Sequence, residues 1–234
     1  MNFQDKVVLV TGAAGNLGRA VAQAFSQQGA RLALVDLKPE ALQQAFGAEH
    51  DRQAFFAGNL MKQDEADAAA LAVIARFGRI DVLCNLAGGF RMGAPVHETS
   101  AQDWDFLFDL NARTLLHTAK AMVPAMLKGG GGKIVNVAAY AAQEGSARMG
   151  AYAASKSAVI RLTETMAAEL REHNINVNCV LPTILDTPQN RADMPQADPR
   201  RWVAPADLAQ VIVFLASDAA RAIHGAALPV SGLS

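Results

Sequence analysis

The chain has 234 residues, of which 51% are hydrophobic and 18% charged, and its formal net charge is -1 at pH 7. This balance provides no basic surface for nucleic acid or for an anionic membrane, and the composition excludes a disordered or fibrous chain. We therefore expect a globular protein, one α/β domain over residues 1–234, that binds a small molecule or further copies of itself.

Short apolar runs alternate along the chain with longer amphipathic stretches, a rhythm typical of repeated βαβ units. The strands are predicted at residues 6–10, 31–35, 53–57, 80–85, 133–137, 176–181 and 227–230. The helices are predicted at residues 17–28, 39–46, 63–77, 101–127, 151–173 and 205–217. Because the strand runs are continuously apolar, we expect a doubly wound parallel sheet of about seven strands with helices on both faces.

The least regular segment is residues 182–204, which contains four prolines and an Asp-Thr-Pro turn. A loop of this length in a compact domain usually has a function, so we interpret it as a lid over a substrate. The run of four glycines at residues 129–132 indicates a flexible turn between a helix and a strand rather than a domain linker.

The first predicted strand is followed by Thr-Gly-Ala-Ala-Gly-Asn-Leu-Gly, residues 11–18, which leads directly into a helix. Small residues let backbone N–H groups approach a pyrophosphate, and the start of a helix favours its negative charge. A tight strand-to-helix turn explains the glycines equally well when they are taken alone. The second strand ends at Asp36, whose carboxylate can bind ribose hydroxyls and repel a 2′-phosphate. The two features together predict a Rossmann fold that binds NAD(H) in preference to NADP(H), with a helix cap or surface turn as the alternative for Asp36.

Tyr152 and Lys156 are four residues apart in a predicted helix, so both project from one face of it. The ordinary pKa of a tyrosine is about 10, and a neighbouring ammonium group favours the phenolate and lowers that pKa. The pair therefore predicts an acid–base group, although the same spacing on its own is also found on solvated helix faces.

These motifs together resemble the short-chain dehydrogenase/reductase family along essentially the whole chain. The matching parts are the glycine turn at residues 11–18, the Asn85-Leu86-Ala87-Gly88 segment, Asn111, and Tyr152 with Lys156. The resemblance implies an NAD(P)-dependent oxidoreductase that moves a hydride between nicotinamide and a small carbonyl, alcohol or quinonoid substrate. In it Tyr152 would exchange a proton, Lys156 would lower the pKa of Tyr152 and hold the nicotinamide ribose, and Asn111 would anchor a water of the proton relay. The alternative for Asn111 is a buried amide bonded to helix backbone.

The resemblance also implies cofactor contacts that extend from the glycine turn to the lid. They are Gly12, Ala14, Gly15, Asn16, Leu17, Gly18, Asp36, Asn59, Leu60, Asn85, Ala87, Gly88, Tyr152, Lys156, Pro182, Ile184 and Thr187. In this family the long helix and the helix that carries the Tyr-Lys pair pack against another subunit, so the resemblance implies a homo-oligomer, either a tetramer or a dimer.

The chain departs from the family pattern at three positions. Asn16 stands where the family has its middle glycine, and because asparagine tolerates unusual backbone angles we expect binding to survive. Asn59 replaces an acidic residue that often contacts the adenine. Ala139, thirteen residues before Tyr152, replaces a serine whose hydroxyl stabilises the substrate oxygen. Loss of such a donor costs about 3 kcal/mol in comparable sites. The hydroxyls of Tyr140 and Ser146 could substitute if their loop folds inward, although an exposed loop serine is the alternative for Ser146.

Two other functions follow from the missing serine. The dihydropteridine reductase branch of the family also lacks it, and residues 181–191, the Met194-Pro195 pair, Trp202 and residues 87–90 are similar to that branch. This resemblance implies NADH-dependent reduction of a quinonoid dihydropterin. The alternative from another class is a catalytically silent regulatory protein that binds a dinucleotide. Substrate identity depends on the shape of the lid rather than on a motif.

The expected location is the cytoplasm. Residues 1–5 lack the character of a signal peptide, and no apolar run reaches the roughly 20 residues that span a bilayer. Cys84 and Cys179 are the only cysteines, and each lies in an apolar run, which favours buried free thiols. The five histidines lack metal-ligand spacing, so no metal site is expected.

Overall fold

The computed structural model describes residues 1–234, in which each apolar run forms a strand of one parallel sheet. The strands are β1 (Val7–Thr11), β2 (Arg31–Asp36), β3 (Gln53–Ala57), β4 (Val82–Asn85), β5 (Gly132–Val137), β6 (Ile175–Pro182) and β7 (Ala227–Val230). Their order is β3-β2-β1-β4-β5-β6-β7, with every neighbouring pair parallel. The predicted doubly wound sheet of seven strands is therefore confirmed.

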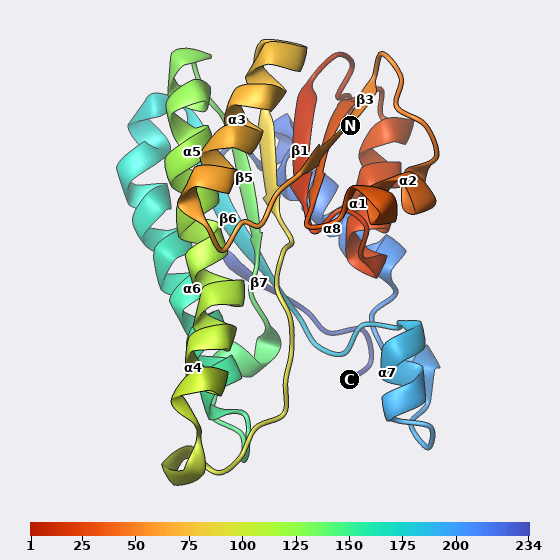
Figure 1. Cartoon of the computed structure of the whole chain (residues 1–234), viewed down its shortest axis with the longest axis vertical. Coiled ribbons are helices and arrows are strands. Elements are labelled where there is room, and N and C mark those ends of the chain that lie inside the picture. The colour runs from red at the N-terminus through yellow and green to blue at the C-terminus, as the bar shows by residue number, and fades with distance from the viewer.

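Helices cover both faces of the sheet (Figure 1). On one side lie α3 (Gln63–Phe77), α5 (Thr114–Lys128) and α6 (Gly150–Leu170), and on the other lie α1 (Asn16–Gln27), α2 (Pro39–Phe46) and α8 (Pro205–Leu215). Two shorter helices, α4 (Ala101–Phe108) and α7 (Pro188–Asp193), lie towards the lower end of the molecule in this view. The covering on both faces explains why the strands read as unbroken apolar runs.

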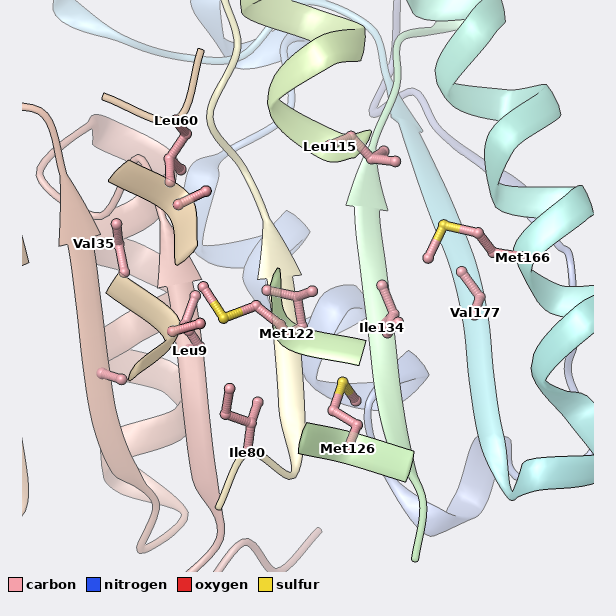
Figure 2. Packing of buried hydrophobic residues seen from close by; sticks show 14 of the residues in the cluster. Leu9, Val35, Leu60, Ile80, Leu115, Met122, Met126, Ile134, Met166 and Val177 are labelled. Carbon is pink, nitrogen blue, oxygen red and sulfur yellow. The ribbon is translucent and has the colours of Figure 1, made fainter. Parts of the chain in front are cut away.

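Alternation along each strand divides the buried side chains into two cores. On β1, Leu9 packs on the side of α3, α5 and α6, whereas Val8 and Val10 pack on the side of α1, α2 and α8. Figure 2 shows the first core, in which Met122 and Met126 of α5 lie over the sheet. Each such side chain contributes about 1.5–3 kcal/mol by leaving water. Together the cores hold the carboxyl ends of the strands at one edge of the molecule.

The helix predicted at residues 101–127 is interrupted. A π-helical segment, Asp109–Arg113, separates α4 from α5. Within it Asn111 is only 2% exposed, and its carboxamide bonds to groups outside the helix. An added residue in the turn widens the helix locally, and such π turns are frequent at functional sites. The apolar periodicity of the sequence does not reveal a π turn, because the periodic pattern continues on both sides of the turn.

The predicted lid segment, residues 182–204, contains the short helix α7 rather than irregular chain alone. The Thr187 side chain caps α7 by accepting from the Asn190 N–H, and Pro188 takes the first helical position. At its base, Leu185 bridges to Val203, and the Asp186 N–H donates to the Val203 carbonyl. The two ends of the segment are therefore bonded to each other, on either side of α7.

Cys84 and Cys179 are both free and buried, as predicted. They lie in different cores, Cys84 on the α1 side of the sheet and Cys179 on the α6 side. None of the helices combines the length and the apolar character needed to cross a membrane.

Candidate active site

A cleft of 1360 Å³ opens at the carboxyl ends of the strands, where the strand order reverses between β1 and β4. Ligands of doubly wound sheets bind at such a reversal. The structure brings sixteen of the seventeen predicted cofactor residues to the wall of this one cleft, and only Asn85 is absent from it. The sixteen are Gly12, Ala14, Gly15, Asn16, Leu17, Gly18, Asp36, Asn59, Leu60, Ala87, Gly88, Tyr152, Lys156, Pro182, Ile184 and Thr187.

The glycine turn is shaped by close backbone approach. Gly12 has φ +62°, and a Cβ there would lie 3.1 Å from the Ala87 backbone. At Gly18 a Cβ would come 2.3 Å from the Gly12 carbonyl oxygen, so only glycine fits. Gly15 is the N-cap of α1 and provides no side-chain cap, which leaves the first N–H groups of the helix available to an anion.

The backbone of Asn16 does not adopt the unusual angle that asparagine would tolerate at this position. It is the first residue of α1 and is not among the residues with positive φ. Its side-chain oxygen accepts from Arg19 Nη2 at 2.8 Å. The departure from the family pattern is accommodated because the residue already belongs to the helix.

Asp36 joins the end of β2 to the glycine turn. Its Oδ2 accepts from the Ala14 N–H at 2.9 Å, and its Oδ1 accepts from the Leu37 N–H at 2.8 Å. Each carboxylate oxygen has a further lone pair, so the group can still accept hydrogen bonds from the cleft. The carboxylate therefore orders the turn and faces the same space.

Asn85 lies beneath the cleft instead of on its wall. Its Nδ2 donates to Asn136 Oδ1 and its Oδ1 accepts from Thr118 Oγ1, both at 2.8 Å. Nearby, Thr11 Oγ1 accepts from the N–H groups of Leu86 and Ala87 at 3.0 and 3.1 Å. These buried bonds join β1, β4 and β5 where the sheet divides, so Asn85 supports the floor of the site.

Tyr152 and Lys156 lie one turn apart on α6, and both line the cleft. Lys156 is 5% exposed, and its Nζ donates to the Val137 carbonyl at 2.9 Å. Burial lowers the pKa of Lys156 to about 8 and raises the pKa of Tyr152 to about 12. The predicted lowering of the Tyr152 pKa by Lys156 does not appear in this structure, because burial of the phenol has the larger effect. At neutral pH the phenol therefore carries its proton.

Asn111 does not line the cleft but holds its surroundings. Its Oδ1 accepts from the Gly89 N–H, and its Nδ2 donates to the Gly89 carbonyl and to Ser155 Oγ at 2.9, 3.1 and 3.0 Å. A Cβ on Gly88 would lie 2.9 Å from Asn111 Oδ1 and 3.0 Å from Lys156 Nζ. The glycine at position 88 lets the two side chains approach each other. Asn111 is buried, but its partners are the backbone of Gly89 in a loop and the Ser155 side chain, so the expected bonds to helix backbone are not found.

Ala139 lies on the cleft wall and is 4% exposed. The loop that follows it also reaches the cleft, since Tyr140, Glu144 and Ser146 are lining residues. Ser146 is exposed and lines the cleft at the same time. The loop after Ala139 therefore folds towards the site, as it must if the hydroxyl of Tyr140 or Ser146 is to replace the missing serine.

Several lining residues were not predicted individually as site residues, although Asp193 and Met194 lie in the predicted lid and Phe90 and Met194 in the segments that carry the dihydropteridine reductase resemblance. Phe90 packs edge-on against Tyr152, with ring centroids 4.9 Å apart and planes at 89°. Arg91, Met92, Met149, Asp193 and Met194 line the same region. Their common signal is position, because each lies on a segment that follows the carboxyl end of β4, β5 or β6.

A parallel sheet in this order, with a glycine turn at its point of reversal, defines a Rossmann-type α/β protein. A family model described as short chain dehydrogenase matches residues 6–198. The chain belongs to the short-chain dehydrogenase family and is an oxidoreductase.

Three proteins illustrate what this chain is similar to. A D-threitol dehydrogenase of Mycolicibacterium smegmatis is 39% identical over 242 residues, which cover 98% of this chain and 93% of the relative. A sorbitol dehydrogenase of Cereibacter sphaeroides is 36% identical over 187 residues, or 80% of this chain and 73% of the relative. A solved NAD+-bound xylitol dehydrogenase is 30% identical, with 99% of this chain and 100% of that chain covered and a TM-score of 0.91.

Proposed function

We propose that this protein is an NAD(H)-dependent dehydrogenase that interconverts a hydroxyl group of a small polyol or alcohol and the corresponding carbonyl. The observation that carries the proposal is that the glycine turn and the Tyr152–Lys156 pair line one cleft. Relatives named for threitol, sorbitol and xylitol support a polyol as the substrate class.

The residues of the cleft fit a dinucleotide. Gly12 and Gly18 keep the turn free of side chains where a pyrophosphate would lie against the start of α1. Asp36 would accept from the adenosine ribose and repel a 2′-phosphate, which supports NAD(H) over NADP(H). Asn59 and Leu60 would lie beside the adenine, and Pro182, Ile184 and Thr187 would meet the carboxamide. Asn85 would act indirectly, by supporting the Ala87 and Gly88 backbone.

The proton is assigned to Tyr152 and the hydride to the cofactor, since a bound nicotinamide accepts or donates hydride. The Tyr152 hydroxyl exchanges the proton at the substrate oxygen, and Lys156 stabilises the phenolate when its ammonium group is charged. Burial raises the pKa of Tyr152 to about 12, so at neutral pH the phenol carries the proton that reduction of a carbonyl requires. Oxidation needs the phenolate, so its rate should rise with pH. Asn111 keeps Gly89 and α6 in position around this pair.

Ala139 favours a second candidate function. With no hydroxyl at this wall, a substrate that delocalises the incoming hydride is easier to reduce than a simple ketone. A quinonoid dihydropterin would have this property, and it is the alternative that the sequence resemblance of the lid segment implies. For a polyol-derived ketone, the hydroxyls of Tyr140 and Ser146 are the available substitutes.

The test is hydride transfer, followed by nicotinamide absorbance, with threitol, sorbitol, xylitol, their ketones and quinonoid dihydropterin. The parent should oxidise a polyol, and Tyr152→Phe should be slower by at least about 100-fold, which is a common contribution of an acid–base group. Equal rates in the two proteins would refute the role of Tyr152. Binding of NADH by calorimetry with no turnover of any substrate would instead support the silent regulatory protein.

We also propose that the protein is a cytoplasmic homo-oligomer, a dimer or a tetramer. Trp104 of α4 is 43% exposed and Leu116 of α5 is 54% exposed, which is consistent with a further subunit on these helices. The two buried free thiols suit a reducing compartment. Light scattering of the purified protein measures the assembly, and a monomeric mass would contradict it.

A further inference from the structure

The cleft that contains Tyr152 has two carboxylates in its lining that no basic side chain neutralises. Glu144 lies on the loop after β5, and Asp193 is the last residue of α7. Neither takes part in any ion pair of the structure. Asp193 Oδ1 accepts only from the neutral Gln189 side chain, at 2.8 Å. Both residues are exposed and line the cleft, so their charges are close to a ligand that enters it.

Three basic side chains lie in or beside this lining, and none of them pairs with Glu144 or Asp193. Arg148, which directly precedes the lining residue Met149, donates from its Nε to the Gly93 carbonyl at 3.1 Å. Arg91 Nη1 lies 2.6 Å from Asp103 Oδ1, and its guanidinium carbon lies 4.5 Å from the centre of the Phe106 ring. Lys156 is buried against the Val137 carbonyl, beside Tyr152. The remaining lining residues, including Phe90, Met92, Met149 and Met194, are uncharged. Glu144 and Asp193 therefore add two negative charges to the lining against the one positive charge of Lys156, since Asp103 balances the charge of Arg91.

This balance selects among substrates. A carboxylate only accepts hydrogen bonds, so it recognises the hydroxyl groups of a ligand and repels anionic groups. In a cleft with apolar walls the field of such charges is focused on the ligand. Methionine side chains adapt to carbon chains of different shape, which makes charge rather than shape the stricter criterion here.

We propose that Glu144 and Asp193 determine specificity, by accepting hydrogen bonds from the distal hydroxyls of an uncharged polyhydroxy substrate and by excluding substrates that bear a carboxylate or a phosphate. The inference rests on the proposed dehydrogenase function and identifies its substrate class. It assigns Tyr152 to the reacting hydroxyl and the two carboxylates to the hydroxyls further along the chain.

The test uses three compounds with one carbon skeleton: sorbitol, which is neutral, gluconate, which is an anion, and 1-amino-1-deoxysorbitol, which is a cation. We would measure kcat/KM for each with saturating NAD+ and calorimetric binding of each to the NADH-loaded protein. The parent should prefer sorbitol to gluconate by at least about tenfold, because Glu144 and Asp193 repel the carboxylate of gluconate. The preference should shrink as salt is added.

The double variant Glu144→Gln, Asp193→Asn should reduce the preference for sorbitol over gluconate to within about threefold, since it removes both charges and keeps hydrogen-bonding groups. The matched control Glu169→Gln, Glu172→Gln removes two exposed charges near the far end of α6 and should leave the preference as in the parent. A double variant that discriminates as strongly as the parent would overturn the inference.

The other outcomes are also decisive. Equal use of sorbitol and gluconate by the parent would overturn the inference while leaving the dehydrogenase function in place. Preference for the amine over sorbitol by tenfold would show a cationic substrate class and would overturn the assignment to an uncharged one. If none of the three compounds is turned over or bound, this inference is overturned. If threitol and xylitol also fail, the proposed polyol function is overturned with it.

Discussion

Lys156 shows at a single residue how the site conflicts with the stability of the fold. Its ammonium group is buried, and burial lowers its pKa from 10.5 to about 8. Below pH 8 the folded and unfolded chains both carry this charge, and the folded chain bears the full cost of burying it. Between pH 8 and 10.5 only the unfolded chain keeps the proton, so stability rises with pH. A shift of this size corresponds to about 3 kcal/mol.

Lys156→Met should therefore abolish turnover while raising the free energy of unfolding at pH 7 by about 1–3 kcal/mol, the lower values reflecting loss of the bond to Val137. Urea denaturation at pH 7 and pH 10 measures the effect, which should be smaller at pH 10. Lys128→Met, at an exposed position, is the control. A stability difference that does not change with pH would contradict the assignment of the cost to the buried charge.

Asp36 makes a second prediction at the residue scale. Asp36→Asn removes the charge but keeps an oxygen that can accept from the Ala14 N–H. We expect the ratio of the NADPH and NADH dissociation constants to shift by about tenfold towards NADPH, since repulsion of a 2′-phosphate is lost. Calorimetric titration with both cofactors measures this ratio. An unchanged ratio would show that Asp36 stabilises the glycine turn and does not select between the two cofactors.

At the scale of elements, the glycine turn provides a pair of matched substitutions. Gly18→Ala places a methyl group 2.3 Å from the Gly12 carbonyl oxygen, whereas Gly15→Ala places one 3.3 Å from the same atom. We expect Gly18→Ala to destabilise the fold by about 1–3 kcal/mol and to weaken NADH binding, because backbone has to shift. Gly15→Ala should cost less stability. Thermal unfolding of both variants, with and without NADH, tests the order, and a reversed order would contradict the geometry.

The elements themselves were predictable because local signals agreed with the fold. Unbroken apolar runs such as Ile175–Pro182 mark strands buried on both faces, and Pro39 and Gly78 stand near helix ends. The π-helical segment was not predictable, since it depends on partners of Asn111 that are 22 and 44 residues away. Helix α7 was missed although Thr187-Pro188 is a usable start signal, because the proline count of the segment outweighed it.

The site was predictable where a motif exists and not elsewhere. Tyr152, Lys156 and the glycine turn have fixed spacing, so the sequence identifies them directly. Phe90, Glu144 and Asp193 come together only because β4, β5 and β6 end at one edge of the sheet. The pKa of Tyr152 could not be predicted from the sequence either, because the burial of the phenol depends on packing and not on the spacing of residues.

At the scale of the whole molecule, the two cysteines can be used to probe the opening of each core separately, because each lies in a different core. Burial raises the pKa of both thiols, that of Cys179 to about 11. Thiolate is the reactive form, so neither should react with a thiol reagent in the folded protein. We expect labelling of Cys84→Ala to follow opening of the α6 side, and labelling of Cys179→Ala to follow opening of the α1 side. Rapid labelling of either variant without denaturant would contradict this burial.

The pairing of β1 with β4 has a consequence for synthesis on the ribosome. Val8 pairs with Val82, so the centre of the sheet cannot close until the fourth strand has emerged. The cleft draws its wall from Gly12 to Met194, and a nascent chain with a finished glycine turn still lacks the groups that would surround the reacting end of a ligand. Non-local pairings of this kind slow folding. A ligand that binds this cleft can therefore stabilise only the nearly complete polypeptide. Stabilisation by ligand is then the last step of folding.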